Sequence, residues 1–205
     1  MMSDLFLAVK EEIQKYLADK DFTLRGGDFV RKKSPFKREE CIILYSRRSR
    51  APYDYVEITA LCNIYYKEVN ALDKKVVADF LNAYPIIAGS IGYFKENGPN
   101  YFFINIASVS EVDHVVQEII KNITEGAFNL FNNIYPTLES IVEGIRLKKP
   151  FLRDYIKPSL RESVRIAAML YLTENKENAL AWFEDSAPDE KDKSLFLEKM
   201  KNNWK

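Results

Sequence analysis

Apolar residues at the start of the chain recur at helical spacing. Over Asp4–Ala18 they return every three or four positions, which predicts an amphipathic helix with one buried side and Ser3 as its N-cap. That side consists of Leu5, Val9, Ile13, Tyr16 and Leu17. The pattern then changes to shorter β-prone runs divided by turn residues, so the helix leads directly into a sheet.

Four strands are predicted in the following stretch: Phe22–Arg25, Asp28–Lys32, Glu40–Arg47 and Asp54–Tyr66. Gly26-Gly27 predicts a two-residue hairpin turn, because glycine adopts positive φ without a Cβ clash. Pro35 marks a loop, and Ala51-Pro52 ends the third strand. Along Asp54–Tyr66 apolar residues alternate with polar and aromatic ones, so we expect one face under a helix and the other partly wet.

The second half of the chain becomes progressively helical. A helix over Asn70–Tyr84 is predicted to end at Pro85, and strands over Ile86–Phe94 and Tyr101–Ala107 flank a turn at 95–100. Ser110 opens the most strongly amphipathic helix, with Gly126 as an interruption and aromatic residues continuing toward Tyr135. Four further helices are predicted after Pro136: Thr137–Leu147, Ser159–Leu172, Lys176–Glu184 and Asp189–Asn203.

Strands that occur as hairpins, rather than alternating one by one with helices, favour an α+β fold. We therefore predict an antiparallel, meander-like sheet covered by helices, with an all-helical C-terminal part. The composition shift near Pro136 divides the chain into a sheet domain over residues 1–135 and a helical part over 136–205 packed on it.

Composition and charge indicate the class of protein and the compartment in which we expect it. Of 205 residues 47% are hydrophobic, and 30 basic residues balance 30 acidic ones, so a charged surface arises only locally. No apolar run approaches the roughly 18 residues of a membrane helix, and the acidic N-terminal segment is unlike a signal peptide. We expect a soluble cytoplasmic protein without membrane contact. Cys41 and Cys62 lie in apolar strands and are predicted to be buried thiols, with a cross-strand disulfide as the alternative.

Few residues offer catalytic chemistry. His114, the single histidine, falls on the polar side of its helix and is expected at the surface, and the sulfur and imidazole groups cannot supply a zinc site. The chain contains neither GxxxxGK[ST] nor GxGxxG, so we expect no nucleotide cofactor. Carboxylates at Glu39, Glu40, Asp54 and Glu57 could hold a metal ion, although no Glu-x-Lys follows on a strand as in metal-dependent nucleases.

Positive charge is concentrated in two segments. Residues 25–50 contain nine Arg or Lys against three acids, a net of +6, and residues 146–165 contain seven against two, a net of +5. Residues 174–198 contain eight acids against three lysines, a net of −5. Such segregation favours either a partner-binding basic face or basic loops that pair with the acidic tail. The candidate partner-binding residues, which we call the arginine rim, are Arg25, Arg31, Arg47, Arg48 and Arg50.

The run from Asp21 to Arg31, DFTLRGGDFVR, directly after the first helix, resembles a bacterial family of unknown function. In that family a helix ends in a hairpin of the form Gly-Phe, basic, small, Phe-x-Arg, and here Asp21 stands in place of the glycine. The run Ser110–Phe131 is similar to the second half of the family, so the resemblance covers about residues 4–131. It implies an α+β fold and no known activity, and some such proteins are regarded as immunity-like or antitoxin-like binders.

These observations favour a non-enzymatic, bacterial protein-binding module whose arginine rim meets an acidic protein partner. The alternative is nucleic-acid binding through the same rim, since arginine and aromatic residues can contact phosphates and stack on bases. A second alternative is a metal-dependent hydrolase that uses the four carboxylates. The sequence leaves the oligomeric state open.

Overall fold

The structure is a computed structural model that describes residues 2–49, 54–77, 84–96, 101–149, 152, 155 and 157–205. Arg50, the predicted break at Ala51-Pro52 and most of the predicted turn at 95–100 lie outside these residues. The chain divides into two compact units. The first comprises Met1–Lys33, Glu39–Ile64 and Ala88–Ile134; the second comprises Ser34–Arg38, Tyr65–Ile87 and Tyr135–Lys205.

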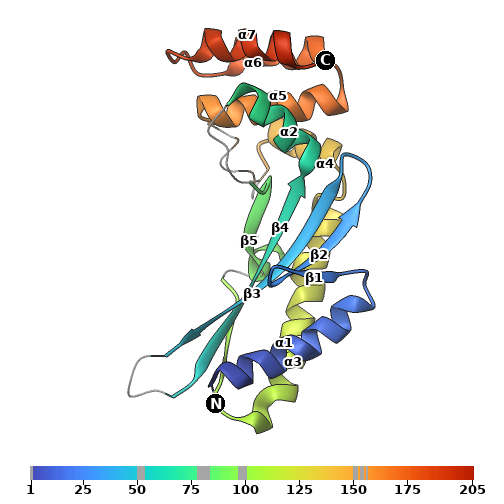
Figure 1. Ribbon diagram of the computed structural model, residues 1–205, viewed down its shortest axis with the longest axis vertical. Coiled ribbons are helices and arrows are strands. Elements are labelled where there is room, and N and C mark those ends of the chain that lie inside the picture. The colour runs from blue at the N-terminus through green and yellow to red at the C-terminus, as the bar shows by residue number, and fades with distance from the viewer. Residues whose placement is uncertain are drawn as a thin grey trace. The chain divides into compact units, whose positions relative to one another are not determined.

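A six-stranded antiparallel sheet with helices confirms the predicted α+β fold (Figure 1). Five strands follow one another in the sheet in chain order, as in a meander, and the sixth pairs with β4. The strands are β1 (Thr23–Arg25), β2 (Asp28–Lys33), β3 (Arg38–Arg48), β4 (Val56–Tyr66), β5 (Ile87–Ser90) and β6 (Phe103–Ile106).

Strand register fixes which side chains meet across the sheet. The pairing of Arg25 with Asp28 leaves Gly26 and Gly27 as a two-residue turn with φ of 58° and 98°, which confirms the predicted hairpin. At the two ends of the β3–β4 pair, Ser49 N donates to Tyr55 O and Lys67 N donates to Lys37 O. Both bonds fit one register, which sets Arg47 opposite Glu57 and Tyr45 opposite Thr59.

Two helices of the first unit, α1 (Met2–Ala18) and α3 (Val112–Asn122), cover one face of the sheet (Figure 1). That face contains the fully buried alternate residues of β4, among them Ile58, Ala60 and Cys62. The opposite face changes from buried to exposed along β3, where Tyr45 and Arg47 are exposed; at this end of the strand Ser46 and Arg48, on the other face, are exposed as well. The alternation of β4 thus meets a helix layer on one side only, as its sequence pattern predicted.

The prediction of a single strand over Ile86–Phe94 is wrong in its second half. After β5 the chain forms a 3₁₀ turn, η1 (Ile91–Phe94), with Ile91 and Phe94 buried. This turn lies against a π-helical continuation of α3, η3 (Ile123–Phe128), and Asn129 Nδ2 donates to Phe94 O at 2.7 Å. Tertiary packing against η3 therefore stabilises a turn where the apolar run alone favours a strand.

Two predicted helix boundaries also need correction. The first part of the helix predicted over Asn70–Tyr84 is α2 (Lys67–Val76), which follows β4 without a loop and ends at the extended Val77; residues 78–83 lie outside the described residues. Gly126 does not end the helix that α3 begins. A short 3₁₀ turn, η2 (Val109–Glu111), precedes α3, and the chain continues after it through η3 and a second π-helical segment, η4 (Leu130–Ile134).

The second unit is built from α2 and the four predicted C-terminal helices. These are α4 (Leu138–Arg146), α5 (Leu160–Thr173), α6 (Lys176–Ser186) and α7 (Lys193–Asn203). Capping boxes begin α4 at Thr137 and α5 at Ser159, which explains why these starts were predicted well. The helix α7 begins four residues later than predicted, because a bend and turn occupy 187–192.

Candidate functional site

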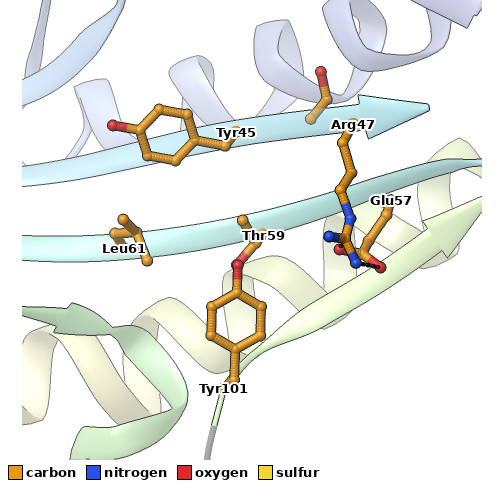
Figure 2. A pocket seen from close by; sticks show the side chains of 7 residues that line it. Tyr45, Arg47, Glu57, Thr59, Leu61 and Tyr101 are labelled. Carbon is orange, nitrogen blue, oxygen red and sulfur yellow. Dashed lines mark hydrogen bonds and ion pairs between the residues drawn. The ribbon is translucent and has the colours of Figure 1, made fainter. Parts of the chain in front are cut away.

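Strands β3, β4 and β6 leave part of one sheet face uncovered, and we call this area the open face. Cross-strand pairing arranges it in rows: Tyr45, Thr59 and Phe103 form one row, and Arg47, Glu57 and Asn105 form the next. Figure 2 shows the β3 and β4 members of these rows in front of the strands, with helices behind. A hollow of about 180 Å³ lies there, lined by Tyr45, Ser46, Arg47, Glu57, Thr59, Leu61 and Tyr101.

Large aromatic side chains on the open face are half exposed. Tyr45 is 51% exposed, Tyr101 50% and Phe103 54%; Tyr45 belongs to β3, and the other two belong to the segment that forms β6. Exposed aromatic surface of this kind commonly marks an interaction site, because covering apolar area that is in contact with water lowers the free energy.

An ion pair sits at one end of the hollow. The Arg47 Nε lies 2.8 Å from Glu57 Oε1, and Arg47 Nη2 donates to Glu57 Oε2 at 3.1 Å, so the guanidinium and carboxylate meet edge to edge (Figure 2). The hydrogen bond and charge of Glu57 raise the pKa of Arg47, with small contributions from Tyr101 and Tyr55. The hollow therefore combines aromatic walls with a fixed, electrically neutral polar pair.

Partly buried hydrogen bonds hold the β6 side of the hollow in place. Thr59 Oγ1 donates to Phe102 O at 2.6 Å, and Phe102 N donates to Ser90 Oγ at 2.6 Å. Phe102 lies between Tyr101 and Phe103, so these bonds fix the backbone that carries both aromatic residues. The open face is thus preorganised, which lowers the entropy that a partner must overcome on binding.

Within the arginine rim, Arg31 has a role inside the first unit. Its Nε and Nη2 both lie 2.7 Å from Oε2 of the fully buried Glu40, and Lys33 Nζ lies 3.3 Å from the other carboxylate oxygen. The guanidinium also stacks near the rings of Phe22 and Phe128, at 4.7 and 5.6 Å from their centroids. Arg31 therefore connects the sheet to η3.

The remaining rim residues do not share one surface. Arg47 is on the open face, whereas Arg48, the next residue of β3, points to the opposite side and lies 3.5 Å from the exposed Asp54. Arg25 is exposed at the end of β1, and β2 separates this strand from β3 in the sheet. Arg50 lies outside the described residues. The structure thus places a single described member of the rim in the hollow.

The four candidate carboxylates do not converge. Glu40 is buried with Arg31 and Lys33, Glu39 lies on the other face of β3, and Glu57 is held by Arg47. Among the described residues no group of three or more His, Cys, Asp or Glu side chains could hold a metal ion. This arrangement offers no support for the hydrolase alternative.

The two thiols are buried and free, as predicted for Cys41 and Cys62. The β3–β4 register sets Cys41 opposite Asn63, so the two sulfur atoms point to different faces of the sheet. Burial raises the pKa of the Cys62 thiol. His114 is exposed on α3, which confirms its predicted surface position.

The second basic segment belongs to the second unit and partly pairs there with acids. Arg146 binds Glu174, the first residue of the acidic tail, and Arg165 Nη2 lies 3.3 Å from the buried Asp73. A separate hollow of about 180 Å³ is lined by Tyr84, Ser159, Arg161, Glu162 and Arg165. Glu162 already accepts hydrogen bonds from Ser159, so the α5 N-terminus is capped by the chain itself.

Comparisons with family models, with curated proteins and with solved structures gave no match to this chain. The resemblance to the bacterial family of unknown function therefore stays a prediction. No helix in the described part of the chain is both long and apolar enough to cross a membrane.

The sequence did not predict that Tyr45, Tyr101 and Phe103 are exposed together, because aromatic residues on strands pack most often in a core. The sequence signal that could have identified these aromatic residues is the partly solvent-exposed face predicted for β4. Residues opposite Glu57 and Thr59 on the neighbouring strands share that face, and they include Tyr45 and Phe103.

Proposed function

We propose that this chain is a non-enzymatic protein-binding module and that the open face of β3, β4 and β6 is its docking surface. One observation carries the proposal: Tyr45, Tyr101 and Phe103 are half exposed around a hydrogen-bonded Arg47–Glu57 pair. Tyrosine, phenylalanine and arginine are enriched at protein interfaces, where rigid aromatic anchors supply most of the binding free energy.

The proposed partner is a protein, as the sequence predicts, but charge is not the main feature by which the open face recognises it. Arg31, Arg47 and Arg48 each face a carboxylate of their own chain, so the arginine rim has little charge left for a strongly acidic surface. Recognition then rests on aromatic contact and shape, with the ion pair orienting the partner. An immunity-like role, as the resemblance implies, would use such docking to cover a partner's surface.

The test is a photo-reactive amino acid placed at Tyr45 or at Tyr101 in the full chain, expressed in its host. Leu147, which is 58% exposed in the second unit, is the matched control position. We expect the same protein to be cross-linked from both open-face positions and not from Leu147. The variant Phe103→Ser should lower its yield. Equal capture from all three positions, or capture that Phe103→Ser leaves unchanged, would contradict the proposal.

Single-stranded nucleic acid is the second candidate, because exposed aromatic rings on a sheet can stack on bases. Charge argues against it: Arg47 is the one Arg or Lys among the residues that line the hollow, and it is paired with Glu57. Fluorescence anisotropy with labelled oligonucleotides at low and high salt separates the two candidates. We expect no binding, whereas binding with a steep salt dependence that Phe103→Ser abolishes would favour nucleic acid.

A further inference from the structure

Within each row of the open face, the residue on β3 differs in charge or in size from the residue on β4. In one row β3 carries the cation Arg47 and β4 carries the anion Glu57, and in the adjacent row β3 carries the large Tyr45 and β4 the small Thr59. Each row therefore pairs a group on β3 with its electrostatic or steric complement on β4.

A two-fold axis between two copies of the chain places each of these residues opposite its complement. If two copies face each other and the axis runs parallel to the strands, midway between β3 and β4, each β3 lies over the β4 of the other copy. Positions along the strands are unchanged, so Arg47 lies over the second copy's Glu57, and Tyr45 lies over the second copy's Thr59. Such isologous contacts are how most homodimers form, and sheets pack face to face in this near-aligned way.

The same axis also covers Phe103. Strand β6 lies beyond β4, so its Phe103 is carried to the outer side of β3 in the other copy, next to Tyr45. One symmetry operation therefore covers the rings of Tyr45 and Phe103 and matches both charges. An acidic or basic partner would match only one member of the neutral Arg47–Glu57 pair.

We infer that the occupant of the open face is a second copy of this chain, arranged about this two-fold axis. The inference rests on the proposed function, because it names the partner of the same docking surface. The two ion pairs form a four-charge cluster at the end of the interface. Arg47 is 77% exposed, so much of this cluster remains in contact with water and avoids the full cost of burying charge.

The experiment uses the purified full chain alone, studied by sedimentation velocity over a range of concentrations. We expect a reversible dimer. Arg47→Glu makes the pair wholly acidic and Glu57→Arg makes it wholly basic, so each variant alone should dimerise on the order of tenfold more weakly or worse. Mixing the two variants in equal amounts should restore dimers, because each acidic face then meets a basic one.

Two further variants guard against misfolding and against an unrelated interface. Phe103→Ser changes an exposed ring and should weaken dimerisation while leaving the circular dichroism spectrum unchanged. Leu147→Glu, at an exposed position of the second unit, should leave dimerisation unchanged.

A monomer at every concentration would overturn the inference. It would leave the proposed function standing if the cross-linking experiment captures a different protein through the open face. A dimer that is insensitive to Arg47→Glu and Phe103→Ser, or variants that fail to recombine on mixing, would also overturn it.

Discussion

Replacing Gly126 with alanine tests how closely the η1 turn packs against η3. A Cβ atom added at Gly126 would lie 2.0 Å from the carbonyl oxygen of Ile91 and 2.9 Å from its carbonyl carbon. Both atoms belong to the backbone, so no side-chain rotation can relieve the overlap. Either η1 or η3 would have to shift by about 1.5 Å, because ordinary contacts between non-bonded heavy atoms begin near 3.5 Å.

Two effects of opposite sign set the magnitude. Alanine in place of glycine favours a helix by about 1 kcal/mol. Overpacking costs about 1–3 kcal/mol, and the upper end applies here because the overlap is with the backbone. The net expectation for Gly126→Ala is a loss of about 2 kcal/mol in the free energy of unfolding, roughly thirtyfold in the folding equilibrium. The melting temperature should fall by about 4–8 °C.

The assay is urea unfolding followed by far-ultraviolet circular dichroism. Both tryptophans, Trp182 and Trp204, belong to the second unit, so their fluorescence reports separately on that unit. Lys121→Ala, an exposed change near the end of α3, is the control and should alter stability by no more than about 0.5 kcal/mol. A Gly126→Ala protein as stable as the wild type, or more so, would refute the close approach of Ile91.

The same substitution links packing to docking. The η1 turn precedes the segment that carries Tyr101 and Phe103. Asn129 donates to Phe94 O of this turn, and Lys95, the next residue, pairs with Glu125 of η3. A shift of η1 should therefore displace part of the open face. Cross-linking from position 101 should fall more in Gly126→Ala than in Lys121→Ala when both proteins are fully folded.

Two further predictions concern buried titratable groups. Glu40→Gln leaves Arg31 without its buried carboxylate and should lower the free energy of unfolding by about 3 kcal/mol. Glu12→Gln, in the exposed pair with Lys15, should lower it by less than about 1 kcal/mol. Chemical denaturation of both variants measures the difference, and equal losses would contradict the prediction. Burial raises the pKa of Tyr135 to about 12, above its ordinary value of about 10, so its contribution to stability is fully present below the ordinary pKa and is lost as pH rises through the raised one. The free energy of unfolding should thus fall less steeply between neutral and strongly alkaline pH in Tyr135→Phe than in the wild type, and identical slopes would contradict this assignment.

The hairpins and most helices could be predicted because their signals are local. Gly26-Gly27 requires positive φ at both positions, and the capping residues Thr137 and Ser159 each bond to the first turn of their own helix. The turn at Ile91–Phe94 has no such local signal. Its apolar residues fit a strand equally well, and only packing against the distant η3 decides between the two conformations.

The open face could be predicted in part. Alternation along β4 predicts one partly wet face, and Glu57 and Thr59 lie on that face. The exposure of Tyr45 could not be predicted, because it depends on where the helix layer covers the sheet and where it does not. An aromatic residue on a strand has the same sequence signal whether a helix covers it or water does.

The arginine rim shows why charge counted along a chain overstates the charge of a hairpin. Residues 25–50 have a net charge of +6, but that window stops before Asp54 and Glu57 on the returning strand. Antiparallel pairing brings Arg47 against Glu57, ten positions away, and the adjacent Arg48 against Asp54. Strand register therefore determines the electrostatic field at the surface that a partner contacts. At the open face, the register produces a neutral ion pair among exposed aromatic rings. If docking depends on that pair for orientation and on the rings for free energy, raising the salt concentration should weaken dimers only slightly, whereas loss of Phe103 should weaken them strongly.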